Sequence, residues 1–382
     1  MVNKIILNLR NAGRDTDIEF PCTEKEMSEA LEKIAIPELN APKVYVSEVV
    51  EPLGLSMLEG KTLNLDEVNY LAKLLDSLVQ DERDKIYAVA NYEGYDTPKE
   101  LINVYFNPDS YTLVQDLKSI EQVGRQHCMT IKGGMTTDEA QKTDFAKIGR
   151  DLLFSKKGVF TDYGLLFRNE GIEFREIYDG QVFPQYSYYG DELFTVEMEY
   201  NGKREYLYLA EVTRSIDKAL ARLGAKDYSD CKLQICDFNI ESKIWLERFK
   251  AMLNKESIYA VNEAVQAFNV AGMDLEKLDA LVRYVKDDSA DTIIKLAEHI
   301  DDFKFIYYAE DYEDVGKYAA ENIRDANLPI ELADYIDYEA YGEHIVRECG
   351  GKFLKGGGFV YISGEISLDE ILSQGTGIGE IK

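Results

Sequence analysis

The spacing of hydrophobic and polar positions changes in the same order in both halves of the chain. Each half opens with two short alternating segments, which are joined by NAGRD in the first half and NGKR in the second. Alternation predicts β-strands, and connections of this composition predict hairpin turns. A short helix and a third strand are expected next. The segments are 5–10, 17–20, 24–34 and 44–50 in the first half, and 193–200, 205–210, 215–223 and 232–238 in the second.

Both halves then change to a helical period. Apolar residues recur at helical spacing over 64–75 and 274–285, where Asn64 and Asp274 occupy N-cap positions. Later helices are expected over 292–300, 312–323 and 337–348, and later strands over 163–167, 303–308 and 358–362. The expected fold class is α+β: an elongated chain of small α/β and helical subdomains.

Several stretches of the second half repeat stretches of the first. YIDYEAYGEHI (335–345) matches KTDFAKIGRDL (142–152) at an offset of 193, so that Gly342 corresponds to Gly149. Three further blocks match in the same order: 219–235 with 30–46, 274–285 with 64–75, and 313–317 with 121–125. The order favours a tandem duplication over chance similarity, and insertions into surface loops would explain the changing offset.

The repeat suggests a division into two copies and a tail. The first copy is expected over 1–170, the second over 192–365, with 171–191 as a linker and 366–382 as a flexible tail. Within the copies, the expected subdomains are 1–52 (α/β), 53–125 (mainly helical), 126–170 (α/β), 192–240 (α/β), 241–303 (helical) and 304–365 (α/β).

Charge limits the possible partners. The 382 residues include 71 acids and 43 bases, a formal net charge of −28. Such a chain repels nucleic acid and anionic membrane surfaces, so cations or basic protein surfaces are its expected partners. The five cysteines form no CxxC pair, and neither a secretory segment nor an apolar run of 18 residues is present. A reduced, cytoplasmic protein is expected.

The sequence contains no strong motif for catalysis or for ligand or metal binding. GTGIG (375–379) lacks the strand–turn–helix context of a phosphate loop, and adjacent His127 and Cys128 side chains would point apart in regular structure. DYEDVGKYAAE (311–321) has helical rather than EF-hand spacing. With 71 acids, a plausible carboxylate pair occurs by chance. We therefore expect no catalytic, cofactor-binding or metal-binding residues, and no cofactor.

Acids concentrate in one folded segment. Residues 286–349 contain 18 acids and six bases, interleaved with apolar residues at structural spacing. One interpretation is a solvated face that confers solubility. The other is an array of charge that resembles duplex DNA, which carries one charge per about 1.7 Å of axis.

Three motifs occur in a fixed order: LQICDFNI, DYEDVGKYAAENI and YIDYEAYGEHI. Together they resemble the ArdA-type antirestriction proteins. The matching positions are Ile235, Asp237, Phe238, Asp311, Tyr312, Asp314, Val315, Gly316, Tyr318, Ile336, Asp337, Tyr338, Ala340, Tyr341 and Gly342. The resemblance covers nearly the whole second copy, whereas the first copy keeps only fragments such as Asp144 and Gly149.

The resemblance implies a non-catalytic DNA mimic. Members of that family occupy the DNA-binding groove of type I restriction-modification enzymes and so protect incoming mobile DNA. Each protomer has three small subdomains in a curved row, and two protomers pair. The acids expected to replace phosphates are Asp287, Asp288, Asp291, Glu298, Asp301, Asp302, Glu310, Asp311, Glu313, Asp314, Asp334, Asp337, Glu339 and Glu343.

The chain is about twice as long as a typical member, which leaves its assembly open. It is expected to be either a pseudo-dimeric monomer or a homodimer in which the first copy is an added arm. Bases such as Lys142, Lys147, Arg150, Lys156 and Lys157 set the first copy apart. Two other functions stay open: an acidic adaptor for another basic nucleic-acid-binding protein, and a hydrolase with a carboxylate pair.

Overall fold

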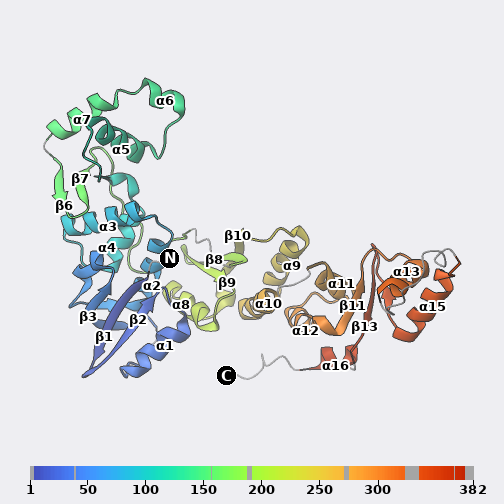
Figure 1. Cartoon of the computed structure of the whole chain (residues 1–382). Coiled ribbons are helices and arrows are strands. Elements are labelled where there is room, and N and C mark those ends of the chain that lie inside the picture. The colour runs from blue at the N-terminus through green and yellow to red at the C-terminus, as the bar shows by residue number, and fades with distance from the viewer. Residues whose placement is uncertain are drawn as a thin grey trace. The chain divides into compact units, whose positions relative to one another are not determined.

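The computed structural model describes residues 4–37, 40–155, 157–186, 192–270, 275–322, 335–364 and 366–374. The fold is mixed α+β, and its strands form small separate sheets (Figure 1). The chain divides into two compact units. The first comprises Met1–Gly190, Glu199–Tyr206 and Asp217–Lys226, and the second comprises Asp191–Met198, Leu207–Ile216 and Asp227–Lys382.

The first unit begins with a sheet of strand order β2-β1-β3-β4. Its strands are β1 (Ile5–Asn11), β2 (Arg14–Phe20), β3 (Lys43–Glu51) and β4 (Thr62–Asn64). The β1–β2 turn has φ of 48° at Ala12 and 80° at Gly13, so both central residues are left-handed, as the twist of a two-residue hairpin favours. Helix α1 (Glu24–Lys33) begins at Thr23, which forms a capping box with Glu26.

Helices follow this sheet. They are α2 (Leu65–Asp76), α3 (Gln80–Glu93) and α4 (Pro98–Tyr105), with 3-10 turns η1 (Leu53–Leu58) and η2 (Pro108–Ser110). Asn64 caps α2 as predicted, because its side chain accepts the N–H of Asp66. The apolar face of α2 is buried, including Val68, Leu71 and Leu75.

Residues 170–186 pack on these helices through side-chain-to-backbone hydrogen bonds. Asn103 is 4% exposed, and its Oδ1 accepts the N–H groups of Ile177 (2.7 Å) and Tyr178 (2.9 Å). Its Nδ2 donates to the Tyr178 carbonyl at 2.8 Å. Phe183 stacks on Tyr70, with ring centroids 4.4 Å apart. These bonds satisfy backbone groups that form no strand or helix.

A buried cation links two distant parts of the first unit. The Lys218 side chain is 3% exposed, and its Nζ lies 2.6 Å from Asp66 Oδ1 and 2.8 Å from Glu24 Oε2. The Arg222 guanidinium pairs with the buried Glu205 carboxylate at 2.8 Å. The two Lys218 pairs join residues more than 150 positions apart, so sequence spacing gives no sign of them.

The first unit also contains a helix pair packed on a small sheet of order β5-β7-β6. The elements are β5 (Tyr111–Val114), α5 (Ile120–Lys132), α6 (Thr137–Lys142), α7 (Phe145–Phe154), β6 (Val159–Thr161) and β7 (Gly164–Arg168). Helices α5 and α7 lie side by side (Figure 1). Their core contains Val114, Val123, Leu165 and Phe167, with Leu152 packed against it.

The middle of the chain forms a three-stranded sheet of order β10-β8-β9. The elements are β8 (Phe194–Tyr200), β9 (Lys203–Leu209), α8 (Thr213–Leu223), η3 (Tyr228–Asp230) and β10 (Lys232–Phe238). Asn201 and Gly202 have φ of 50° and 78°, which repeats the turn geometry of the first hairpin. Written in the reverse order, β9-β8-β10, this sheet has the same connectivity as β2-β1-β3 of the first sheet.

The second unit continues with helices and ends with a sheet of order β11-β13-β12. Its helices are α9 (Lys243–Leu253), α10 (Ile258–Val270), α11 (Leu275–Val285), α12 (Ala290–Glu298), α13 (Tyr312–Asn322), α15 (Tyr338–Cys349) and α16 (Leu368–Ser373), with η4 (Ile300–Asp302). Its strands are β11 (Phe303–Ile306), β12 (Lys352–Phe353) and β13 (Phe359–Ile362).

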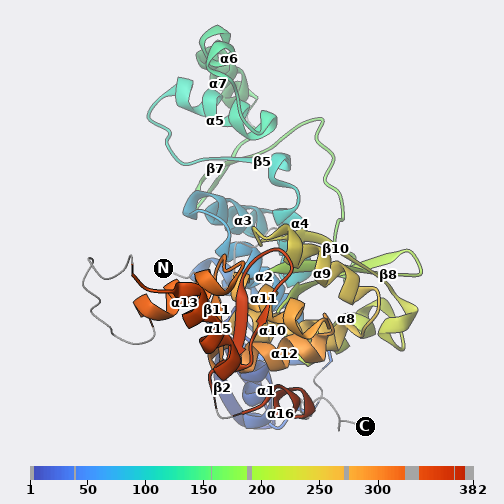
Figure 2. The same ribbon diagram turned by 90° about the vertical axis from the view of Figure 1, so that its right-hand side faces the viewer.

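The predicted α+β class and the predicted strands and helices named above are confirmed, apart from small shifts of their ends. The expected N-cap Asp274 and the GTGIG segment lie outside the described residues. We expected a flexible tail over 366–382, but the structure packs part of this segment: Ile371 of α16 is fully buried. Lys295 Nζ also donates to the Leu372 carbonyl at 2.8 Å, and α16 lies beside α12 (Figure 2).

Candidate functional site

Most of the candidate acids lie on α12, α13 and α15 or immediately before these helices. Helices α13 and α15 cross in close contact at Gly316 and Gly342. A Cβ at Gly316 would overlap with the Tyr338 carbonyl oxygen, and one at Gly342 would overlap with that of Tyr312. Only glycine lets the two backbones approach this closely, so the first turns of both helices lie side by side.

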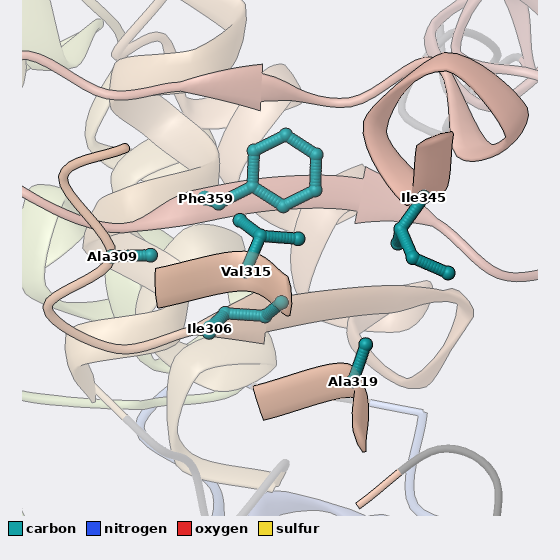
Figure 3. Packing of buried hydrophobic residues seen from close by; sticks show 6 residues of the cluster. All are labelled: Ile306, Ala309, Val315, Ala319, Ile345 and Phe359. Atoms are coloured by element: carbon teal, nitrogen blue, oxygen red, sulfur yellow. The ribbon is translucent and has the colours of Figure 1, made fainter. Parts of the chain in front are cut away.

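An apolar cluster holds the crossing in place. Val315 and Ala319 of α13 and Ile345 of α15 pack with Ile306 and Phe359 of the sheet beneath them. Figure 3 shows Val315 between Phe359 and Ile306. Each of these side chains is at most 8% exposed. The opposite faces of both helices are therefore left for polar residues.

Acids occupy the starts of both helices. Asp337 is the N-cap of α15 and accepts the Ala340 N–H at 2.9 Å, while Asp311 accepts the Asp314 N–H at 3.1 Å before α13. Glu313 follows in the first turn of α13. Negative charge is favourable at helix N-termini, so the fold accommodates these acids at little cost.

The described candidate acids are all outside the core. Asp334 lies outside the described residues. Three candidates are partly exposed: Asp291, Asp302 and Asp314. The exposed candidates are Asp287, Asp288, Glu298, Asp301, Glu310, Asp311, Glu313, Asp337, Glu339 and Glu343.

Four candidates have a cationic neighbour, which lowers the net charge of the surface. The pairs are Asp291–Lys295 at 2.6 Å, Asp302–His299 at 2.8 Å, Glu313–Lys317 at 2.6 Å and Glu343–Arg347 at 2.8 Å. The Glu313–Lys317 and Glu343–Arg347 pairs are exposed and lie within one helical turn, where such pairs contribute about 0.3–0.5 kcal/mol each. A basic partner surface could replace Lys317 and Arg347 at small cost, whereas Lys295 is buried.

Two groups near α12 have shifted pKa values. A hydrogen bond from the Thr292 hydroxyl lowers the pKa of Asp287, which keeps this carboxylate ionised. The hydrogen bond with Asp302 raises the pKa of His299, which also lies 3.1 Å from Gln374 Oε1. His299 thus connects the end of α12 to the C-terminal helix.

Tyrosines near the crossing make packing contacts. The Tyr312 ring meets Phe353 edge-on, with centroids 5.5 Å apart, and Tyr341 packs against the apolar cluster. Tyr312 is nevertheless 40% exposed. These rings support the helices while part of Tyr312 stays in solvent.

The geometry gives little support for nucleophilic or metal chemistry. Burial raises the pKa of the Cys22 thiol to about 12 and also raises that of Cys128. Raised values disfavour the reactive thiolate. Among the described residues, no group of three or more His, Cys, Asp or Glu side chains is placed to hold a metal ion. Over the same parts of the chain, no helix has the length and apolar character needed to cross a membrane.

The helix pair of the first unit has the same crossing but a different charge. A Cβ at Gly124 would overlap with the Phe145 carbonyl oxygen, and one at Gly149 with that of Ile120. Helices α5 and α7 carry two acids and four bases, whereas α13 and α15 carry six acids and two bases. Similar backbone packing therefore presents opposite net charge in the two units.

Part of the chain is similar to a known protein family. Residues 205–360 match the family described as antirestriction protein (ArdA). This match supports an antirestriction function in general terms, and it contains all of the candidate acids. No curated protein matches the chain.

Proposed function

We propose that the chain is an antirestriction protein that mimics DNA and occupies the DNA-binding groove of a type I restriction-modification enzyme. In this proposal the acids of the second unit replace phosphates against lysine and arginine on the enzyme, and so protect incoming mobile DNA. The observation that carries the proposal is that the family match contains the exposed acids of α12, α13 and α15.

The rigid support of these acids favours mimicry over a purely solubilising role. The glycine crossing and the cluster around Val315 fix the helices on which Glu313, Asp337 and Glu339 lie. A fixed array loses less conformational entropy on binding than a disordered acidic segment would. The general solubility of an acidic protein would not need such fixed positions.

We further propose that the two copies, 1–170 and 192–365, descend from a tandem duplication. Their sheets β5-β7-β6 and β11-β13-β12 have the same connectivity, and both helix pairs cross at two glycines. The core residues Val123 and Val315 occupy matching positions of the repeated blocks. The first copy keeps the scaffold, but the charge on α5 and α7 argues against phosphate mimicry by that pair.

Competition with DNA tests the proposed mimicry. A type I enzyme bound to labelled target DNA would be titrated with the protein at several salt concentrations. Displacement should weaken steeply as salt rises, because the interactions of exposed charges are screened. If DNA is displaced at none of these salt concentrations, the proposal is wrong.

A matched pair of variants locates the surface. Glu298→Gln combined with Glu339→Gln removes two exposed acids of the second unit, and we expect weaker displacement. Glu59→Gln combined with Asp162→Asn removes two exposed acids of the first unit and serves as the control. Equal weakening by both variants would mean that net charge matters rather than this surface. Complete loss from a single carboxylate change would instead favour a hydrolase.

The proposed duplication also raises the question of assembly. A fused pseudo-dimer would stay monomeric, because pairing within one chain has a high effective concentration. Light scattering at low protein concentration measures the mass directly. A stable dimer of full chains would contradict the pseudo-dimer and favour the first copy as an added arm.

A further inference from the structure

The second unit contains a basic pocket outside the acidic helix faces. Its volume is about 660 Å³, within the range of small-molecule sites. Five cationic side chains line it: Arg248, Arg283, Lys286, Lys352 and Lys355. They come from α9, from the end of α11 and from the β12–β13 hairpin. A concentration of positive charge is unexpected in a chain of net charge −28.

One aspartate serves both arginines of the pocket. Asp279 accepts from Arg248 Nη2 at 2.7 Å and from Arg283 Nε at 2.9 Å. Arg283 Nη1 also donates to the Lys355 carbonyl at 3.1 Å, which ties the hairpin to α11. Within the described parts of the chain, Arg248 Nε is buried and has no hydrogen-bond partner. A single carboxylate thus orients two guanidinium groups but neutralises only one charge.

The two acids at the rim, Asp287 and Asp288, offset only part of the positive charge. Asp287 accepts hydrogen bonds from Ser289 and Thr292 at the start of α12. Its neighbour Asp288 is exposed. Lys352 places its Nζ 5.2 Å from the centre of the Tyr284 ring, a cation–π contact that leaves the charge in place. The pocket therefore keeps an excess of positive charge.

Lys286 occupies a conformation that ordinarily favours glycine. It follows the last residue of α11, has φ of 65°, and its N–H donates to the Val282 carbonyl at 2.8 Å. A non-glycine residue is less stable than glycine in the left-handed region. The sequence thus places a lysine charge at the pocket where glycine would be the more stable helix terminus.

We propose that this pocket binds a small anion that carries two or more phosphate groups. Five cations around one cavity repel one another, and a polyphosphate would relieve that repulsion while accepting charge-assisted hydrogen bonds. Tyr284 and Phe353 also line the cavity and supply an apolar wall. The inference goes beyond DNA mimicry, because it concerns the cations of the pocket, although the rim acids Asp287 and Asp288 are also among the candidate acids.

Binding of pyrophosphate and of ATP to the full-length protein tests the inference by calorimetry. We expect saturable binding of both, weaker binding of inorganic phosphate, and no binding of adenosine. Bound ligand should also raise the melting temperature, since it binds only the folded state. Absence of saturable binding of pyrophosphate and ATP at millimolar concentration would overturn the proposal.

Two variants and a control assign the binding to this pocket. Lys286→Gly should bind pyrophosphate about tenfold more weakly, as for the loss of one charge-assisted contact, while the fold keeps or gains stability. Lys352→Met should weaken binding similarly. Lys304→Met changes an exposed lysine of β11 that does not line the pocket, so affinity should stay unchanged. Equal affinity in all three variants would show nonspecific ion binding and refute the site.

Discussion

Replacing Gly342 by alanine tests whether the backbone contact between α13 and α15 determines the geometry of the acidic surface. In an open helix this change stabilises by about 0.5–1 kcal/mol, because glycine loses more conformational freedom on folding. Here the added Cβ would overlap with the Tyr312 carbonyl oxygen and lie 2.9 Å from the Gly316 nitrogen. Both neighbours are backbone atoms, so no change of side-chain rotamer relieves the overlap.

The helices would therefore have to separate, and the cluster beneath them would lose contacts. Overpacking of a tight contact costs about 1–3 kcal/mol. Separation also opens space around Val315 and Ile345, which adds a cavity cost. The gain in helix propensity offsets only part of this cost, so we expect a net loss of about 2 kcal/mol.

Hydrogen exchange measured by mass spectrometry on peptides of α13 and α15 reports this loss locally. The control is Ala340→Gly on the exposed side of α15, which should cost about 1 kcal/mol through helix propensity alone. Gly342→Ala should accelerate exchange more than the control does. Unchanged or slower exchange in Gly342→Ala would refute the argument that the crossing requires glycine.

Three further predictions concern stability. Lys218→Met leaves Asp66 buried and unpaired, and urea unfolding should show a loss of about 3–5 kcal/mol. Asn103→Ala leaves the backbone N–H of Tyr178 without its acceptor, so limited proteolysis should cut nearby sooner, with a cost of about 1–3 kcal/mol. His299 has a raised folded pKa, so its stabilising effect should be complete below pH ~6.5 and lost as pH rises through the folded value. Unfolding of the parent and of His299→Gln across this pH range measures the difference.

A Lys218→Met variant as stable as the parent would mean that Asp66 finds other compensation. Unchanged proteolysis of Asn103→Ala would show that the segment is held by its aromatic residues alone. A pH-independent difference between the parent and His299→Gln would remove the proposed role of the Asp302 hydrogen bond.

Sequence patterns predicted most of the local structure because the relevant forces are local. Alternation placed β1 and β2, and the Asn-Gly turn gave the hairpin at Asn201 because left-handed backbone there favours these residues. Helical spacing and capping placed α1 and α2. The packed helix α16 was not predicted, because the burial of Ile371 depends on the surface offered by α12.

The candidate site was predictable only as a set of acids. Composition located the excess of carboxylates, and helical spacing separated their faces from the apolar faces. The crossing at Gly316 and Gly342 needed the structure, since a glycine within a helix does not show which backbone it meets. The basic pocket was not predicted, because Arg248, Arg283 and Lys352 are distant in sequence. The net charge of the surrounding sequence is negative and gives no sign of them.

The α+β class, most elements and the strong negative charge follow from the amino-acid sequence, because periodicity, capping and charge are properties of neighbouring residues. Tertiary contacts determine which backbones meet, which ions are buried and where cations gather. Those features depend on contacts between residues such as Lys218 and Asp66, which lie more than a hundred positions apart. Such pairings leave no periodic signal along a single chain.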